Sequence, residues 1–319
     1  MNRTWCSWNF PILIALCLLL ICRLCACSDN RTQREAAGSS TASATSYDVK
    51  GSRDNVSTVL LPTADGTITY ACDTAAIDAS HTSEGYIMVA YTGTNPNVKL
   101  QITGADSVKY TYNLHKDYEV FPLTVGDGSY QISIYENVTD NHYSIILSQT
   151  IEVVITNEFG PYLYPNQYVN FNNESKAVTK GADLAYSANS DIEVIQNVYN
   201  YVIHNISYDY SKAQSVTPGY LPVVDEVLAS KTGICFDYAS LMAAMLRSQH
   251  IPTRLQIGFM TEEYHAWLSV YTKEAGWING IIEFDGASWT LMDPTYASTS
   301  NSPKDFIAND TDYLTKYVY

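Results

Sequence analysis

The chain has 319 residues, of which 46% are hydrophobic and 16% charged, and 18 Lys and Arg stand against 33 Asp and Glu, a formal charge of −15. So acidic a surface repels phosphate backbones and anionic lipid headgroups, which argues against a nucleic-acid-binding protein. The composition otherwise fits a globular chain long enough for more than one domain.

Residues 1–26 are typical of a secretory signal peptide, with a short basic start and an apolar run too short to span a membrane comfortably. Leu24-Cys25-Ala26-Cys27 resembles a bacterial lipobox, although Cys25 and Arg23 depart from the usual pattern. The resemblance implies a lipid on Cys27, which would hold the chain at the outer face of the bacterial cell membrane. Ordinary signal cleavage followed by secretion is the alternative.

Residues 27–46 are small and polar and predict a flexible tether. The region that folds keeps only Cys72 and Cys235, which cannot build a disulfide framework. A single disulfide between them is one alternative. The other, which we favour, is a small buried thiol at Cys72 within the strand-like run ITYACDT.

Residues 47–157 are predicted to form an all-β sandwich of immunoglobulin-like architecture. Short alternating runs are separated by polar turns at GTNPN, VGDG and NVTDNH, as hairpins require. The runs are TVLLP, TITYA, YIMVAYTG, VKLQITG, VKYTYNL, YQISIYEN and YSIILSQTIEVVI. No catalytic residue types cluster here, so a spacer or adhesion module is favoured over a second active site.

Residues 158–319 are predicted to form a second, α+β domain in which helices precede a mainly antiparallel sheet. An amphipathic helix is expected over residues 191–203, where Ile192, Ile195, Val198 and Val202 fall three or four residues apart. The loop SYDYSKAQSVTPGYLP follows it. Strands are expected near RLQIGFM, YHAWLSVYT, GIIEFDGASW and TLMD.

Cys235 lies where a loop gives way to a buried helix that ends near Ser248, before Ile251-Pro252. The unpaired N–H groups and the positive dipole end of a helix N-terminus favour a thiolate, and can lower a cysteine pKa from ~8.5 toward roughly 3.5 to 7.5. Gly233 would permit close approach of a substrate backbone or an unusual turn. A cysteine that merely fills space at the helix start is an equal alternative on this residue alone.

Two later residues could use such a thiolate. His265 starts the strand YHAWLSVYT, on the face opposite Ala266, Leu268 and Val270. Asp293 ends a strand that Pro294 prevents from continuing. Taken singly, these residues are more often structural, but together with Cys235 they match a nucleophile, its base and the residue that orients the base.

Four motifs in order resemble the transglutaminase-like superfamily over roughly residues 185 to 319. They are Gly233-Ile-Cys235-Phe-Asp-Tyr-Ala-Ser-Leu-Met, Ile251-Pro-Thr-Arg254, His265-Ala-Trp267 and Trp289-Thr-Leu-Met-Asp293-Pro-Thr295. The resemblance implies a papain-related fold in which Cys235 is the nucleophile, His265 the general base and then acid, and Asp293 the residue that fixes the imidazole tautomer.

The oxyanion of such a reaction would be stabilised by the Cys235 backbone N–H, which belongs to a helix N-terminus. The second donor stays open, with Gln214, Tyr220 and Tyr208 in the preceding loop as candidates. Trp267 either packs behind the histidine or lines the cleft. Asp237 is interpreted as a helix-stabilising residue of the first turn.

These patterns predict a surface-anchored cysteine enzyme that acts on amide bonds of peptides or proteins through a thioester, with hydrolysis favoured over acyl transfer. No metal-ligand spacing and no phosphate-binding glycine loop occurs in the sequence, so no metal and no cofactor is expected. The expected partners are a peptide or protein substrate at the cell surface and the membrane, through the lipid anchor alone. The alternative is a non-catalytic surface scaffold built on an idle fold of this kind.

Overall fold

The computed structural model describes residues 49–115, 117–260, 263–279, 282–284, 289–291 and 313–319. The predicted signal peptide, the tether and the lipidation residue Cys27 lie outside these residues, and so does Asp293. Within the described part of the chain, no helix has the length and apolar character needed to cross a membrane.

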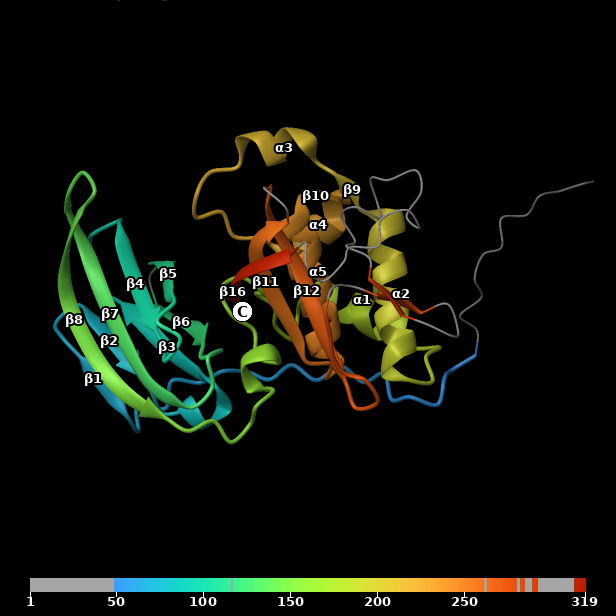
Figure 1. The fold of residues 1–319 in the computed structure, drawn as a ribbon, viewed down its shortest axis with the longest axis horizontal. Helices are drawn as coiled ribbons and strands as arrows, with labels where there is room; N and C mark the ends of the chain where they lie inside the picture. The colour runs from blue at the N-terminus through green and yellow to red at the C-terminus, as the bar shows by residue number, and fades with distance from the viewer. Residues whose placement is uncertain (1–48, 116, 261–262, 280–281, 285–288, 292–312) are drawn as a thin grey trace, which may run out of the picture. The chain divides into compact units, whose positions relative to one another are not determined.

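Two four-stranded antiparallel sheets make up the N-terminal part of the described chain (Figure 1). In β4, Val98, Leu100 and Ile102 are buried and alternate with half-buried neighbours, because successive side chains face opposite sides of a sheet. One sheet has the order β1 (Thr69–Ala71), β2 (Ala75–Asp78), β3 (Tyr86–Tyr91), β6 (Asp117–Pro122), and the other β5 (Lys109–Leu114), β4 (Val98–Thr103), β7 (Gly128–Thr139), β8 (His142–Val153).

Five α-helices and two short 3-10 helices are described, and the α-helices all follow the two sheets in the chain. They are η1 (Thr82–Glu84), η2 (Gly160–Tyr162), α1 (Lys176–Ala185), α2 (Asp191–Asn205), α3 (Tyr210–Ser215), α4 (Val224–Ser230) and α5 (Cys235–Ser248). The predicted helix at 191–203 is α2, which begins where the Ser190 hydroxyl accepts a hydrogen bond from the Glu193 N–H at 3.3 Å.

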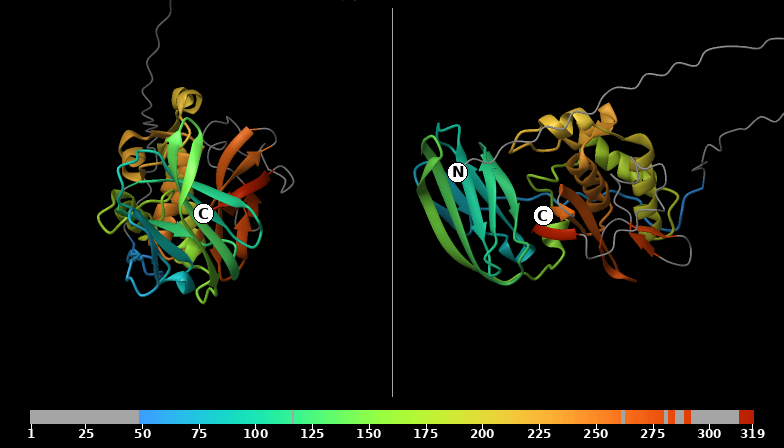
Figure 2. Two further views of the ribbon diagram at one scale, coloured as in Figure 1. Left: turned by 90° about the vertical axis from the view of Figure 1, so that its left-hand side faces the viewer. Right: turned by 45° about the horizontal axis from the view of Figure 1, so that its top comes forward.

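The second half of the chain carries a four-stranded antiparallel sheet that packs against α5. Its order is β13 (Gly276–Asn279), β12 (Glu263–Thr272), β11 (Thr253–Met260), β16 (Tyr313–Val318). Figure 2 shows β16, in red, beside the orange strands of this sheet. Two pairs complete the fold: β9 (Ser207–Tyr208) with β10 (Thr232–Gly233), which is parallel, and β14 (Ile282–Phe284) with β15 (Trp289–Leu291).

Helix α5 is the central element of this region, since α1, α2 and α4 pack on it as well as β11 and β12. Every residue from Asp237 to Ser248 is buried. The sequence predicted a helix buried on at least one side, through Ala239, Met242, Ala243 and Leu246. The structure has the helix enclosed by helices on one side and by the sheet on the other.

Two predictions for the N-terminal part are wrong. The run TVLLP, residues 58–62, forms no strand, and the Thr58 N–H donates to the Ser248 carbonyl oxygen at 2.8 Å, which places the run beside the end of α5. Cys72 is exposed rather than buried, because β1 is a three-residue edge strand and Cys72 lies just after it in the turn to β2. Cys72 and Cys235 are both free thiols.

Arg247 anchors the far end of α5 although only 1% of it is exposed. Its guanidinium donates to the main-chain oxygens of Thr253 at 2.8 Å, Tyr164 at 2.8 Å and Tyr319 at 2.9 Å. One side chain thus joins α5 to the segment before α1, to the start of β11 and to the residue after β16. A buried cation needs this complete set of acceptors to offset its lost hydration.

Replacing Arg247 by Met should lower the free energy of unfolding by about 3 kcal/mol or more, because it strands buried carbonyl oxygens and opens a gap. Urea denaturation followed by circular dichroism measures the change. Lys180→Met is the control: its ion pair with Asp183 spans 3.5 Å at the surface, so its removal should cost no more than about 1 kcal/mol. Equal losses in the two variants would contradict the anchoring role.

Candidate active site

Cys235 is the first residue of α5, with Ile234 as the residue that caps the helix. The thiol is half-buried and takes part in no disulfide. The short pair β9–β10 fixes the approach, because the Asp209 N–H donates to the Gly233 carbonyl oxygen at 2.9 Å just before the helix begins. The cysteine therefore lies at a helix N-terminus, in the position that the sequence predicted for it.

The carboxylate of Asp237 holds this helix start together and is fully buried. It accepts hydrogen bonds from the Ile234 N–H at 2.8 Å, from the Lys212 ammonium at 2.6 Å and from the Tyr220 hydroxyl at 2.5 Å. The ammonium also donates to the Tyr220 oxygen at 2.6 Å. We call Asp237, Lys212 and Tyr220 the helix-start cluster.

The pKa shifts in the cluster preserve the protonation states that its hydrogen bonds require. Burial lowers the pKa of Lys212, but the hydrogen bonds and charges of Asp237 and Tyr220 outweigh it, so that this pKa lies above its ordinary value. Burial, and next the hydrogen bond to Asp237, raise the pKa of Tyr220 to about 12. At neutral pH the ammonium is therefore charged and the phenol keeps the proton that it donates.

The side chain of Asp237 leaves no room for a side chain at position 233. A Cβ atom on Gly233 would lie 2.6 Å from the Asp237 Cβ and 3.1 Å from its Oδ2. The glycine thus leaves room for the buried carboxylate, a role that differs from the substrate approach or unusual turn suggested by the sequence.

His265 lies near the start of β12, opposite Gly258 of β11, and is 7% exposed. Trp267, two residues on, is 4% exposed, and the two rings stack with centroids 6.5 Å apart and an interplanar angle of 21°. The sequence left open whether Trp267 packs behind the histidine or lines the cleft. In the structure its indole stacks with the His265 ring.

A cavity of about 700 Å³ brings the cysteine and the histidine together, since both line it. Lys99 of β4, with Thr111 and Asn113 of β5, contributes to the same wall. The lining also includes six tyrosines: Tyr168, Tyr208, Tyr220, Tyr264, Tyr317 and Tyr319. The segment before α1 secures the β5 side, because the Gln167 amide donates to the Asn113 carbonyl oxygen at 2.7 Å and to Glu119 at 2.8 Å.

The remaining predicted site residues fall in different places. Tyr208 and Tyr220 line the cavity, although the Tyr220 hydroxyl already serves the helix-start cluster. Gln214 is exposed on α3 and is not among the lining residues. Asp293 lies outside the described residues, and its role stays a prediction. Among the residues that the structure describes, no group of three or more His, Cys, Asp or Glu could hold a metal ion.

Sequence reasoning missed Lys212 and the two C-terminal tyrosines of the cavity lining, Tyr317 and Tyr319. Lys212 lies 25 positions before its partner Asp237 and inside a predicted loop. The one available signal was Asp237 itself, because a buried acid at a helix start requires a cationic or hydrogen-bonding partner. Tyr317 and Tyr319 reach the cavity through the pairing of β16 with β11, which local pattern does not reveal.

Residues 179–280 match the model of the transglutaminase-like superfamily. A stretch of 109 residues is 28% identical to the UPF0252 protein MJ1282 of Methanocaldococcus jannaschii. That match covers 30% of this chain and 31% of the other protein, so the chain spans about a third of the length of the curated relative that it matches.

Solved structures with a similar arrangement include three proteins. A candidate cysteine protease from Cytophaga hutchinsonii aligns with a TM-score of 0.36 and 13% identity, over 79% of this chain and 74% of that one. Red sea bream transglutaminase has a TM-score of 0.27 and 13% identity, over 68% and 48%. A candidate protease from Parabacteroides distasonis has a TM-score of 0.28 and 11% identity, over 64% and 61%.

The structure has a mixed α/β domain. Its central helix, α5, begins at Cys235, and the sheet that packs against this helix carries His265. The chain carries a transglutaminase-like domain at residues 179–280, a range that contains three of the four motifs, those around Cys235, Arg254 and His265. Cys235 and His265 both fall inside this range, and Asp293 follows it.

Replacing Gly233 by Ala should displace Asp237 and lower the free energy of unfolding by about 1 to 3 kcal/mol, because the added Cβ overlaps the buried side chain. Chemical denaturation measures the loss. Thr232→Ala, at the exposed neighbouring position, should change the stability by less than about 0.5 kcal/mol. An unchanged stability in Gly233→Ala would refute the packing role of the glycine.

Proposed function

We propose that the chain is a cysteine-dependent enzyme that acts on amide bonds of peptides or proteins, with Cys235 as nucleophile and His265 as base. The observation that carries this proposal is that the half-buried thiol at the start of α5 and the imidazole on β12 line one cavity. A volume of about 700 Å³ falls within the range of roughly 300 to 1,000 Å³ typical of ligand pockets.

The reaction follows from these groups. His265 takes the thiol proton, and the Cys235 sulfur attacks the amide carbonyl carbon, which gives a tetrahedral oxyanion. The oxyanion collapses, the C–N bond breaks, and the imidazolium returns its proton to the departing amine, which leaves a thioester. Water loses a proton to His265 and attacks the thioester. The C–S bond then breaks, the imidazolium returns its proton to the Cys235 sulfur, and a carboxylic acid leaves. In this proposal Asp293 orients the imidazole.

The oxyanion would be stabilised by the Cys235 N–H at the helix N-terminus. For the second donor we favour Tyr208 over Gln214 and Tyr220, because Tyr208 lines the cavity. Gln214 is exposed outside the lining. The Tyr220 hydroxyl donates to a buried carboxylate.

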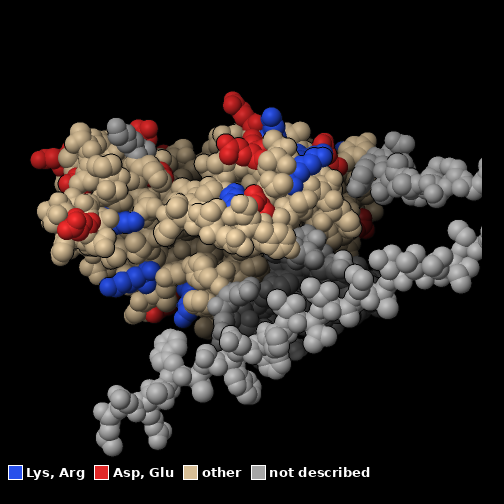
Figure 3. Space-filling model, turned by 90° about the horizontal axis from the view of Figure 1, so that it is seen from above, with Lys and Arg blue, Asp and Glu red and all other residues tan. Residues whose placement is uncertain are grey.

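The location of the enzyme is also part of the proposal. We infer a signal peptide at residues 1–26, a lipid on Cys27, a tether over 27–46, an immunoglobulin-like sandwich at 47–157 and the catalytic domain at 158–319. The net charge of −15 supports a protein or peptide substrate rather than a nucleic acid. On the face shown in Figure 3, acidic and basic side chains are interspersed over a largely uncharged surface.

The thiol should be activated by its histidine. In a Cys72→Ser background, Cys235 should react with iodoacetamide at pH 6.5 at least about tenfold faster than an ordinary exposed thiol, and His265→Ala should remove the difference. Cys72 in the Cys235→Ser variant provides the reference, since it is an exposed thiol of the same protein. Alkylation is followed by mass spectrometry of the peptides that carry Cys235 and Cys72. Equal rates at the two cysteines would support the non-catalytic scaffold instead.

Hydrolysis should outrun acyl transfer. With a peptide library and a labelled primary amine present together, mass spectrometry should find mainly free acids, and Cys235→Ala should form neither product. Protein crosslinks or amine adducts in excess of acids would reverse this assignment and make the enzyme a transferase. The Cys235→Ala protein controls for contaminating peptidases.

A further inference from the structure

The helix-start cluster contains a charge that opposes thiol activation. Asp237 is two residues beyond Cys235, in the first turn of the same helix, and its carboxylate is fully buried. A helix N-terminus stabilises an anion, but a carboxylate already placed there disfavours a second anion beside it. Asp237 without a cationic partner would therefore leave a net negative charge in the first turn of the helix that carries Cys235.

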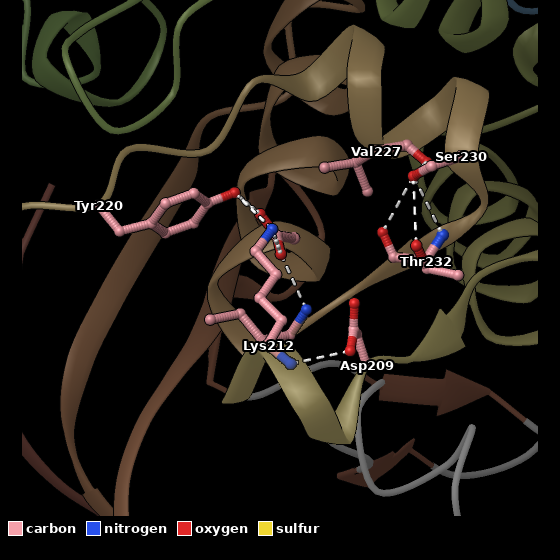
Figure 4. Close-up of polar contacts among 8 residues, drawn as sticks. Asp209, Lys212, Tyr220, Val227, Ser230 and Thr232 are labelled. Atoms are coloured by element: carbon pink, nitrogen blue, oxygen red, sulfur yellow. Dashed lines mark hydrogen bonds and ion pairs between the residues drawn. The ribbon is translucent and has the colours of Figure 1, made fainter. Parts of the chain in front are cut away.

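Lys212 supplies the compensating charge from another element. Its ammonium lies 2.6 Å from the Asp237 Oδ2 and comes from α3, which follows β9 in the chain. The Asp209 carboxylate fixes the start of α3 by accepting the Lys212 N–H at 2.9 Å (Figure 4). The ammonium also lies 4.3 Å from the centre of the Tyr220 ring. The lysine is thus held at both ends, by its main chain and by its ammonium.

We propose that Lys212 is a positioning residue that neutralises Asp237 and so permits the Cys235 thiolate to form. The pair separates two tasks of the helix start. Asp237 organises the turn by accepting the Ile234 N–H at 2.8 Å, and Lys212 offsets the negative charge that this carboxylate places in the first turn of the helix that carries Cys235. The proposal rests on the proposed function, because it takes Cys235 to be a reactive nucleophile.

The other titratable groups around the thiol do not supply this neutralisation. Apart from Tyr220, those that line the cavity with it are His265, Lys99, Tyr168, Tyr208, Tyr264, Tyr317 and Tyr319. In the described part of the chain, the hydrogen bonds and the ion pair of the Asp237 carboxylate are made with the Ile234 N–H, the Lys212 ammonium and the Tyr220 hydroxyl. The Lys99 ammonium donates to the side-chain oxygen of Asn113.

The test is the rate of Cys235 alkylation by iodoacetamide from pH 5 to 9 in the full chain with Cys72→Ser. Lys212→Met should slow the reaction about fivefold or more at pH 6.5, since it leaves an uncompensated carboxylate near the sulfur. Lys212→Arg should keep the rate within about twofold of the parent protein, because it preserves the charge.

The decisive variants carry Asp237→Asn. A structural role predicts that Asp237→Asn and Lys212→Met both impair the site, because each breaks the same contact. Charge compensation predicts that the two substitutions affect the alkylation rate of Cys235 differently. Lys212→Met lowers the rate, whereas Asp237→Asn alone should leave it equal to that of the parent protein or raise it at pH 6.5. Adding Asp237→Asn to Lys212→Met should restore the rate to within about twofold of the parent. Thermal melts of each variant show whether it is folded.

The outcomes separate the two proposals. An ordinary alkylation rate in the parent protein, unaffected by His265→Ala, would remove the proposed function. A fast, histidine-dependent parent rate that Lys212→Met leaves unchanged, or that Asp237→Asn lowers as much as Lys212→Met does, would overturn the charge compensation alone. If Lys212→Met does not fold, the sign of the Asp237→Asn effect still decides.

Discussion

The fold depends on a buried helix that carries a charged side chain near each end. Asp237 and Arg247 of α5 have 0% and 1% of their surface exposed, and each would be costly to bury without partners. Asp237 is satisfied by an ammonium, a phenol and a main-chain N–H, and Arg247 by three main-chain oxygens. Each set includes partners from distant segments, Lys212 and Tyr220 for Asp237 and Tyr164 and Tyr319 for Arg247, so the two charges tie these segments to α5.

This requirement accounts for the placement of the candidate site. A reactive group is held most accurately on a rigid element whose surroundings are themselves fixed. The turn that presents Cys235 is braced by Asp237, and the strand that presents His265 packs on the same helix. The thiol and the imidazole are thus both held by α5, and Tyr220 of the cavity lining also contributes to the helix start through its hydrogen bond to Asp237.

The sequence was most informative where local physics decides the structure. The start of α5 at Cys235, its end at Ser248 and the helix α2 follow from periodicity and breakers, and β12 follows from alternation. It was least informative where distant segments decide. The run TVLLP reads as a strand, but no neighbouring strand pairs with it, and its first N–H bonds to the end of α5 instead. The roles of strand β16 and of Lys212 in the short helix α3 depend on their contacts with β11 and with Asp237, which the local sequence does not predict.

In the sheet that carries His265, the order of the strands across the sheet differs from their order along the chain. Strand β11 pairs with β12, the next strand, and also with β16, which is made only after β13, β14 and β15. The hairpin β11–β12 can form early, but the edge that receives β16 stays open during synthesis, and an open edge invites pairing with other chains. A nascent chain that carries the thiol and the imidazole still lacks Tyr317 and Tyr319 in the cavity wall. A binding surface completed last would delay recognition of substrate until the domain is assembled.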